Sequence, residues 1–388
     1  MKTEPVLILG ELHMLYLRRQ QPQKKALGNR HPSELESASS SMQNYLVGHQ
    51  AAVLSLDTSH IASTGHLLSS SEDGTARLWD FEQKKTVKCF RSPLSVGLHV
   101  SGQPLNCIKW IDEHLAALSC DRNILLIDDR SPMLIQSLSS PSQCCSEAEI
   151  NMLALPSLSP ATSVDHLFFI NDDGVIGEWD IRQQRCTRLS KSGHRSCGTC
   201  LLASSPSTCY SGGTDSQVIQ WEVDALQPVA TQDMSGAAAS SPQVVNPPFV
   251  HDLLMADDTL CCALGDGTLG LMRRRGSSSK KNNKQWRLRP LHSPNVLATL
   301  AYAPTSAGGL LLTAANDLQG YMVSLQDMWE GIDVEKSQNH QVFSLRAPTN
   351  ALGTVSGGET EAGELRGILV ADTTSSIGWL PLPDSKSL

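Results

Sequence analysis

The chain has 388 residues, of which 40% are hydrophobic, and its formal net charge at pH 7 is −8. This length and apolar content allow a large core, and the acidic balance does not recommend a polyanionic partner. The eleven cysteines are an odd set. They exclude the disulfide framework of a short secreted protein, and no secretory signal precedes them, so we expect reduced thiols in the cytosol or nucleus.

Residues 1–43 precede the first regular pattern and are predicted to be an N-terminal arm and linker. The run Val6 to Leu17 is apolar, but Glu11 and His13 interrupt it. It is also shorter than the ~20 apolar residues that a membrane span needs. We therefore expect a disordered or loosely docked arm rather than a cleaved presequence or a membrane anchor.

From residue 73 onward an aspartate recurs at a nearly regular interval. In six units a bulky apolar residue, three times tryptophan, follows it after six residues, and in the last unit Trp379 follows after seven. The seven aspartates are Asp73, Asp121, Asp173, Asp215, Asp266, Asp317 and Asp372. Their spacing is close to, or a little above, the ~40 to 45 residues of a repeat that forms one blade-like sheet. The chain is therefore predicted to be seven small sheets, with its function on faces and loops.

The first unit contains four short β-rich runs, at residues 51–56, 67–71, 75–79 and 86–90. Gly, Ser, Asp and Lys separate these runs, as expected for strands joined by turns. The Asp73-Gly74 step predicts a hairpin between the second and third runs, because glycine tolerates the positive φ of a two-residue turn.

Two units share a histidine, a serine, an aspartate and a tryptophan in the same order. These residues are His49, Ser69, Asp73, Trp79, His194, Ser211, Asp215 and Trp221. The order predicts a network in which the histidine lies between a turn carboxylate and a strand hydroxyl, with the indole N–H closing the chain. A catalytic arrangement would need an exposed nucleophile and an oxyanion site. Because the set occurs twice at the repeat spacing, the structural interpretation is preferred. His292, Thr313 and Asp317 form a partial third copy.

The Gly-His pair that begins such a unit and the Trp-Asp pair that ends it resemble a WD-repeat β-propeller. The resemblance implies an all-β ring of seven four-stranded antiparallel blades over residues 44–384. Closing the ring requires the last sheet to be completed by the other end of the chain, since open edges invite aggregation. We expect residues 44–47 to provide that strand, with Leu46 paired to the C-terminal sheet. The stretch 367–382 also resembles the ending of the WD repeat-containing protein 53 family.

Two adjacent units end in an apolar residue, Asp, any residue and Arg. The predicted partner-binding residues are Asp128, Arg130, Trp179, Asp180 and Arg182. Both arginines are expected at the turn between the third and fourth strands, with each Asp holding the guanidinium fork that follows it. The pair is similar to the signature of WD-repeat substrate receptors that dock on the damaged-DNA-binding adaptor of cullin-4 ubiquitin ligases. That resemblance implies a non-enzymatic scaffold with an unknown client. A purely local salt bridge is the alternative.

A basic loop occupies residues 273–289 and contains no acid. Its cations are Arg273, Arg274, Arg275, Lys280, Lys281, Lys284, Arg287 and Arg289. Such a run can be a nuclear-import signal or a phosphate-contacting patch of a chromatin- or nucleic-acid-associated propeller. A solvated, disordered insertion is the preferred interpretation. Nuclear and cytoplasmic locations both remain open.

Cys197 and Cys200 form a Cys-x-x-Cys motif, which can serve redox exchange or begin a zinc site. No second Cys-x-x-Cys or spaced histidine pair completes a tetrahedron, so buried apolar thiols are the preferred interpretation. The sequence also lacks a Gly-rich phosphate loop and paired catalytic carboxylates. We therefore predict no catalytic residue, no metal and no cofactor.

Overall fold

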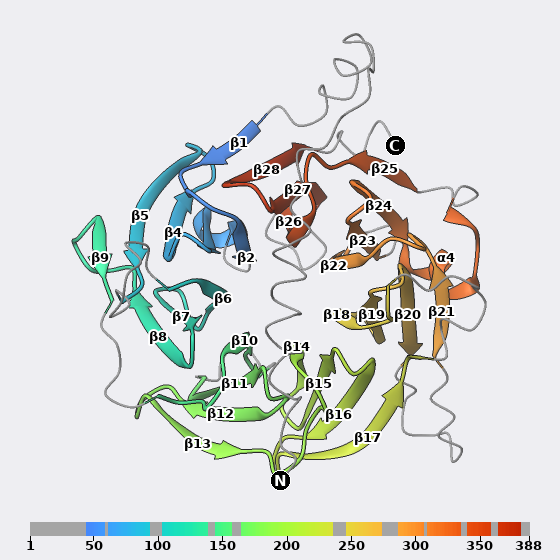
Figure 1. Ribbon diagram of the computed structural model, residues 1–388. Coiled ribbons are helices and arrows are strands. Elements are labelled where there is room, and N and C mark those ends of the chain that lie inside the picture. The colour runs from blue at the N-terminus through green and yellow to red at the C-terminus, as the bar shows by residue number, and fades with distance from the viewer. Residues whose placement is uncertain are drawn as a thin grey trace, which may run out of the picture.

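The computed structural model describes residues 44–58, 61–93, 103–138, 144–156, 164–235, 246–273, 286–305, 309–334, 340–357 and 364–381. The predicted arm, residues 1–43, lies outside these ranges. Seven sheets stand side by side around a common axis (Figure 1). The prediction of an all-β, seven-bladed propeller is therefore confirmed.

The strands of the blades follow in chain order. Blade 1 contains β2 (Val53–Asp57), β3 (His66–Ser71), β4 (Thr75–Asp80) and β5 (Lys85–Arg91). Blade 2 contains β6 (Leu105–Trp110), β7 (Leu115–Cys120) and β8 (Asn123–Asp128). Blade 3 contains β10 (Ile150–Ala154), β11 (His166–Asn171), β12 (Ile176–Asp180) and β13 (Arg185–Leu189). Blade 4 contains β14 (Gly198–Ser205), β15 (Thr208–Gly213), β16 (Gln217–Glu222) and β17 (Gln227–Asp233).

The remaining blades have the same order. Blade 5 contains β18 (Val250–Ala256), β19 (Thr259–Leu264), β20 (Thr268–Arg273) and β21 (Arg287–Pro290). Blade 6 contains β22 (Leu297–Ala303), β23 (Leu310–Ala315), β24 (Gln319–Ser324) and β25 (Gln341–Ser344). Blade 7 contains β26 (Thr349–Gly357), β27 (Glu364–Asp372), β28 (Ser376–Pro381) and β1 (Asn44–Val47). Two short helices lie between strands, α3 (Ile61–Thr64) and α4 (Leu325–Glu330).

The ring closes as predicted. β1 pairs with β28 in antiparallel register, and Leu46 lies opposite Ile377. Leu46 is buried in the same core cluster as Trp79 of blade 1 and Leu369 of blade 7. The first described strand of the chain therefore completes the last sheet, so the edge that β28 would otherwise expose is paired.

Blade 2 departs from the predicted four strands. The short strand β9 (Ile135–Ser137), which follows it in the chain, pairs in parallel with β5 at the edge of blade 1 (Figure 1). The Cys89 N–H donates to the Leu134 carbonyl at 2.9 Å, and Leu138 is buried in the core cluster between blades 1 and 2. The Lys88 ammonium contacts the carbonyl oxygens of Asp129 and Ser131, where the chain leaves β8. These contacts direct the segment to blade 1, so blade 1 has five strands and blade 2 has three among the described residues.

The core lies between neighbouring blades. Trp79, Trp179 and Trp221, which stand near the ends of third strands, are almost fully buried. Each shares a core cluster with the preceding blade, as Trp221 does with Phe168 of blade 3. A large aromatic side chain in this place buries apolar area from two sheets at once, which stabilises the ring by the hydrophobic effect.

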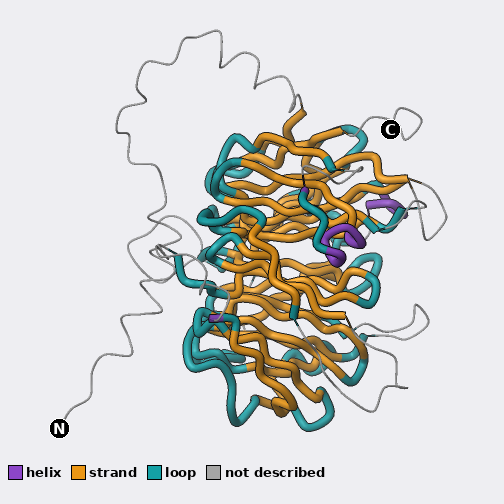
Figure 2. Tube along the Cα trace, turned by 90° about the vertical axis from the view of Figure 1, so that its right-hand side faces the viewer, coloured by secondary structure: helices purple, strands orange, loops and turns teal. Residues whose placement is uncertain are grey.

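The antiparallel order of the strands divides the loops between the two faces of the disc (Figure 2). The loops from first to second strand and from third to fourth strand lie on one face, which we call the insertion face. It carries both helices, the chain after β8, the β12–β13 turn around Arg182, the end of β20 and the start of β21. Neither described helix is long and apolar enough to cross a membrane.

Candidate functional site

The structure brings the four predicted network residues of blade 1 together. His49 Nδ1 lies 3.1 Å from Asp73 Oδ2, and His49 Nε2 lies 2.7 Å from Ser69 Oγ. The Trp79 indole N–H donates to the same hydroxyl at 2.8 Å. Since the carboxylate only accepts, Nδ1 carries the proton and Nε2 accepts from Ser69. The chain of bonds thus runs Trp79 to Ser69 to His49 to Asp73.

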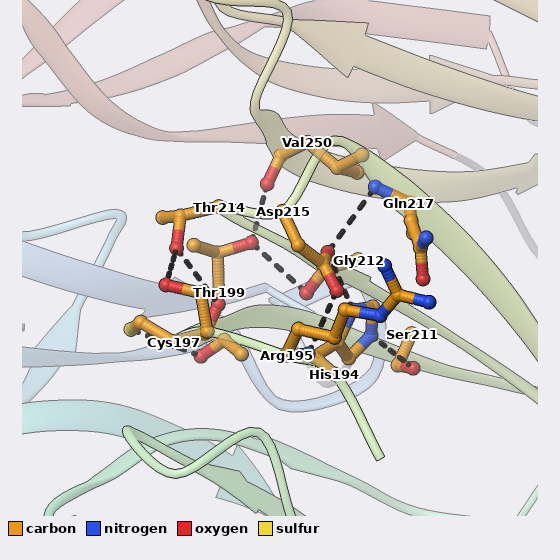
Figure 3. Close-up of polar contacts among 12 residues, drawn as sticks. His194, Arg195, Cys197, Thr199, Ser211, Gly212, Thr214, Asp215, Gln217 and Val250 are labelled. Carbon is orange, nitrogen blue, oxygen red and sulfur yellow. Dashed lines mark hydrogen bonds and ion pairs between the residues drawn. The ribbon is translucent and has the colours of Figure 1, made fainter. Parts of the chain in front are cut away.

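Blade 4 repeats this geometry (Figure 3). His194 lies 2.9 Å from the Asp215 carboxylate and 2.8 Å from the Ser211 hydroxyl. The same hydroxyl also accepts the Trp221 indole N–H at 2.8 Å. Blade 6 has the partial copy, with His292 at 3.2 Å from Asp317 and 3.0 Å from Thr313.

Burial decides what these networks can do. Ser69 and Ser211 have no exposed surface, so neither hydroxyl can reach a substrate. Burial alone would raise the pKa of Asp73, but hydrogen bonds from His49, Thr75 and the Gln50 N–H outweigh it and lower that pKa. A sealed, fully bonded hydroxyl lacks the access that a nucleophile needs. The networks join strands within a blade.

Arg130 is exposed at the end of β8, where it forms a two-pronged ion pair with Asp128. Arg130 Nη2 lies 2.6 Å from Asp128 Oδ2, and Nε lies 2.9 Å from Oδ1. These bonds lower the pKa of the Asp128 carboxyl to about 2. The side chain of Arg130 is still 66% exposed. The guanidinium is therefore oriented by its neighbour and open to solvent, as predicted.

Arg182 is held differently, which corrects the prediction for Asp180. Arg182 Nη2 pairs with Asp165 at 2.8 Å, and its side chain is 73% exposed. The Asp180 carboxylate instead accepts the Gln183 backbone N–H at 2.7 Å and the Gln183 side-chain amide at 3.0 Å. Asp180 therefore caps the turn into the fourth strand and does not bind Arg182. In blade 2 this turn into a fourth strand is missing among the described residues, and Asp128 binds Arg130 instead.

Trp179 also needs a correction as a partner-binding residue. It is only 2% exposed and lies in the core cluster between blades 2 and 3. It therefore supports the strand that ends beside Arg182 but offers no surface to a partner.

The repeat recognised in the sequence has an independent counterpart. A family model described as WD domain, G-beta repeat matches residues 40–80, which include the network of blade 1 up to Trp79 and Asp80. The chain is a WD40-repeat β-propeller. WD40 propellers are typically non-catalytic scaffolds for protein interaction. No curated protein matches the chain.

Solved WD40 propellers resemble this one in fold. The WD40 repeats of RRP9 superpose with a TM-score of 0.65 at 15% sequence identity, over 89% of this chain and 98% of that chain. The structure of U3-55K gives a TM-score of 0.60 at 13% identity, over 87% and 98%. At such identities the likeness concerns the fold alone.

Blade 7 of this WD40 propeller uses an arginine where other blades use the network histidine. Arg346 Nε donates to Asp372 at 2.9 Å, and its guanidinium carbon lies 4.3 Å from the centre of the Tyr45 ring. Tyr45 belongs to the closing strand β1, so this contact ties β1 to the turn of its own blade. Sequence reasoning missed it, although Arg346 precedes Asp372 by 26 residues and the histidines precede their aspartates by 21 to 25.

A second set of contacts joins blade to blade and was also missed. The donor is the side chain of the second residue in a blade's innermost, first strand. The acceptor is a backbone carbonyl of the next blade, that of the residue with which its first strand begins. The pairs are Asn350 to Val53, Asn106 to Ile150, Asn151 to Gly198, and Thr199 to Val250. These bonds occur at four of the seven junctions among the described residues, and they help to set the distance between neighbouring inner strands.

The predicted basic loop begins at the end of β20 and finishes within β21. The structure describes Arg273, Arg287 and Arg289 of this loop. The other five cations, Arg274, Arg275, Lys280, Lys281 and Lys284, lie outside the described residues. Trp286 packs beside Gly270, where an added Cβ would come within 3.2 Å of the indole. Trp286 is thus part of the blade rather than a free stacking surface.

The Cys-x-x-Cys residues are buried, and each thiol has its own surroundings. Cys197 Sγ lies 3.0 Å from the Asp172 carboxylate, and Cys200 belongs to the core cluster between blades 4 and 5. Burial raises the pKa of both thiols well above the usual range. A protonated, buried thiol is a poor nucleophile and a poor metal ligand. In the described part of the chain no three His, Cys, Asp or Glu side chains are placed to hold a metal ion.

Proposed function

We propose that this WD40 propeller is a non-enzymatic scaffold that docks on the damaged-DNA-binding adaptor of a cullin-4 ubiquitin ligase and presents a client protein. The observation that carries the proposal is the pair Arg130 and Arg182. They are exposed on the insertion face of adjacent blades, and each is held by a carboxylate, Asp128 or Asp165. Held guanidiniums lose less side-chain entropy on binding and keep free N–H donors for a partner's carbonyls or carboxylates.

The sequence likeness of residues 367–382 to the WD repeat-containing protein 53 family agrees with a receptor role. A receptor of this kind would work in the nucleus, the cytoplasm or both. Its client would bind elsewhere on the propeller, because the two arginines would be covered by the adaptor.

The test is co-precipitation of purified propeller with the adaptor. We expect the double variant Arg130→Ala, Arg182→Ala to reduce adaptor binding at least tenfold. The matched control is Arg122→Ala, Arg195→Ala, which removes two exposed arginines of blades 2 and 4 from the opposite face. Equal binding by both double variants would contradict adaptor docking through these arginines.

The unequal anchors allow a sharper comparison. Asp165→Asn removes the ion pair of Arg182, whereas Asp180→Asn leaves it and disturbs only the turn. We expect weaker adaptor binding for the first and binding within about twofold for the second. The reverse order would mean that the turn, not the arginine, is recognised.

The alternative function is a chromatin- or nucleic-acid-associated propeller that uses the basic run 273–289. The clustered cations of the sequence support it, since phosphate contacts need such charge. The packing of Trp286 removes the stacking aromatic that a single-strand platform would use. Binding to single-stranded nucleic acid that depends steeply on salt and disappears on deleting 274–285 would favour this alternative.

A further inference from the structure

The two ends of the basic loop converge on the short helix α4, which stands beside β20 and β21 (Figure 1). α4 begins after Ser324, whose hydroxyl accepts the Asp327 N–H, and ends at Gly331 in the left-handed conformation. A Cβ on Gly331 would lie 2.7 Å from the Arg289 guanidinium. The glycine therefore permits both the helix end and the close approach of the arginine.

Trp329, in the last turn of α4, has two arginines over its ring. The guanidinium carbon of Arg287 lies 4.1 Å from the ring centre, and that of Arg273 lies 4.5 Å from it. The two guanidiniums are thus less than about 9 Å apart. A cation over the face of an indole is attracted by the ring and is partly desolvated there.

The hydrogen bonds of these arginines end on neutral acceptors. Arg287 Nη1 donates to the Trp329 carbonyl at 2.5 Å, and Arg273 Nη2 donates to the Gln326 side-chain oxygen at 2.5 Å. Arg289 donates to the carbonyls of Met328 and Trp329 at 3.0 and 3.3 Å. Arg289 thereby neutralises part of the negative end of the helix dipole.

The nearest acid linked to this cluster is Glu330 of α4, whose carboxylate accepts the Gln326 side-chain amide rather than a guanidinium N–H. Among the described residues, the hydrogen bonds of Arg273, Arg287 and Arg289 end on amide or carbonyl oxygens and none ends on a carboxylate. A guanidinium has five N–H donors, and the bonds above use one each in Arg273 and Arg287. Within the described part of the chain, most N–H donors of these two cations therefore have no acceptor, on a chain that is acidic overall.

We propose that Arg273, Arg287 and Trp329 form a binding site for a phosphate monoester carried by a partner polypeptide. A phosphate monoester has three acceptor oxygens and a charge near −2, so it can accept bonds from two guanidinium forks at once. A protein phosphate suits the site better than a nucleic acid, because the arginines already occupy the Trp329 ring that a base would need for stacking. Trp329 is a positioning residue that holds the two forks.

The site lies on the insertion face, as Arg130 and Arg182 do, but in blades 5 and 6. The proposal does not rest on adaptor docking, and loss of one function should leave the other unchanged. A phosphorylated partner bound here could be held on the same face as the adaptor.

The test uses a fluorescein-labelled, otherwise neutral peptide with a single phosphoserine, its unphosphorylated form, and a 12-nucleotide single-stranded DNA of mixed sequence. Fluorescence anisotropy is measured on the full chain, with inorganic phosphate as competitor. We expect the phosphopeptide to bind at least tenfold more tightly than the serine peptide. Arg273→Ala, Arg287→Ala should weaken phosphopeptide binding at least tenfold, and Arg287→Lys should weaken it severalfold because a point charge replaces the fork.

Two controls separate this site from general charge and from misfolding. Arg122→Ala, Arg195→Ala removes the same net charge from the opposite face, and circular dichroism with urea unfolding of every variant reports the fold. Equal losses in both double variants, or no preference for the phosphopeptide, would overturn the proposal. So would tighter binding of the DNA with the same dependence on Arg273 and Arg287, which would assign the site to nucleic acid.

Discussion

Ser69 and Ser70 provide a direct measurement of what the buried network contributes to stability. They are adjacent in β3, and neither has any exposed surface. The Ser69 hydroxyl bonds to His49 and accepts the Trp79 N–H, whereas the Ser70 hydroxyl has no hydrogen-bond partner among the residues that the structure describes. Ser69→Ala and Ser70→Ala thus remove the same atom at the same depth, once with its partners and once without.

The expected difference follows from the contacts. Ser69→Ala leaves His49 Nε2 and Trp79 Nε1 buried without the hydroxyl, and each unsatisfied group costs about 1–3 kcal/mol. We expect Ser69→Ala to lower the free energy of unfolding by roughly 2–4 kcal/mol. Ser70→Ala removes a hydroxyl that is already unsatisfied, so its effect should lie between about zero and 1 kcal/mol of stabilisation.

The assay is urea unfolding followed by tryptophan fluorescence and by circular dichroism. A shift of the midpoint at constant slope reports stability, whereas a changed slope reports a change in the unfolded or native state. Equal midpoints for the two variants would refute the reasoning, because the hydroxyl's bonds would then contribute nothing beyond its burial.

Three further predictions concern acid, the closure and the thiols. The pKa of Asp73 is lower in the folded state than in the unfolded state, where it is near 4. Its contribution to stability is therefore present above the unfolded pKa and is lost as the pH falls below it. Asp73→Asn should flatten a plot of the urea midpoint against pH in that range. Arg346→Met leaves the Asp372 carboxylate buried without its cation and should lower the free energy of unfolding by something on the order of 3 kcal/mol. The substitution should also accelerate hydrogen exchange more in β1 than in β18. Ellman's reagent should modify exposed Cys144 in the native protein but reach buried Cys107 and Cys262 only on unfolding; equal rates would contradict their burial.

The repeat made most of the ring predictable. A recurring aspartate turn followed by a tryptophan specifies a hairpin and its buried end through local bonds, so the network of His49, Ser69, Asp73 and Trp79 could be recognised from order alone. The pairing of Leu46 with the last sheet followed from a general rule, since a ring without closure leaves an exposed edge.

Other features escaped because they depend on which segments meet. β9 has three residues and no periodicity, and its position on blade 1 is decided by the Lys88 ammonium and the buried Leu138 side chain. The partner of Arg182 is Asp165, seventeen residues away, because Asp180 is occupied by the turn amide of Gln183.

The sequence by itself determined the number of blades, the closure of the ring and the structural networks, since these arise from short-range bonds repeated at a fixed period. Only the tertiary structure decided which charges are compensated. Whether Arg130, Arg182 or Arg287 meets a carboxylate, a carbonyl or solvent depends on neighbouring strands and loops. An ion pair forms only when two charged groups lie within a few ångströms of each other. For groups in different blades, the number of residues between them in the sequence does not determine that distance.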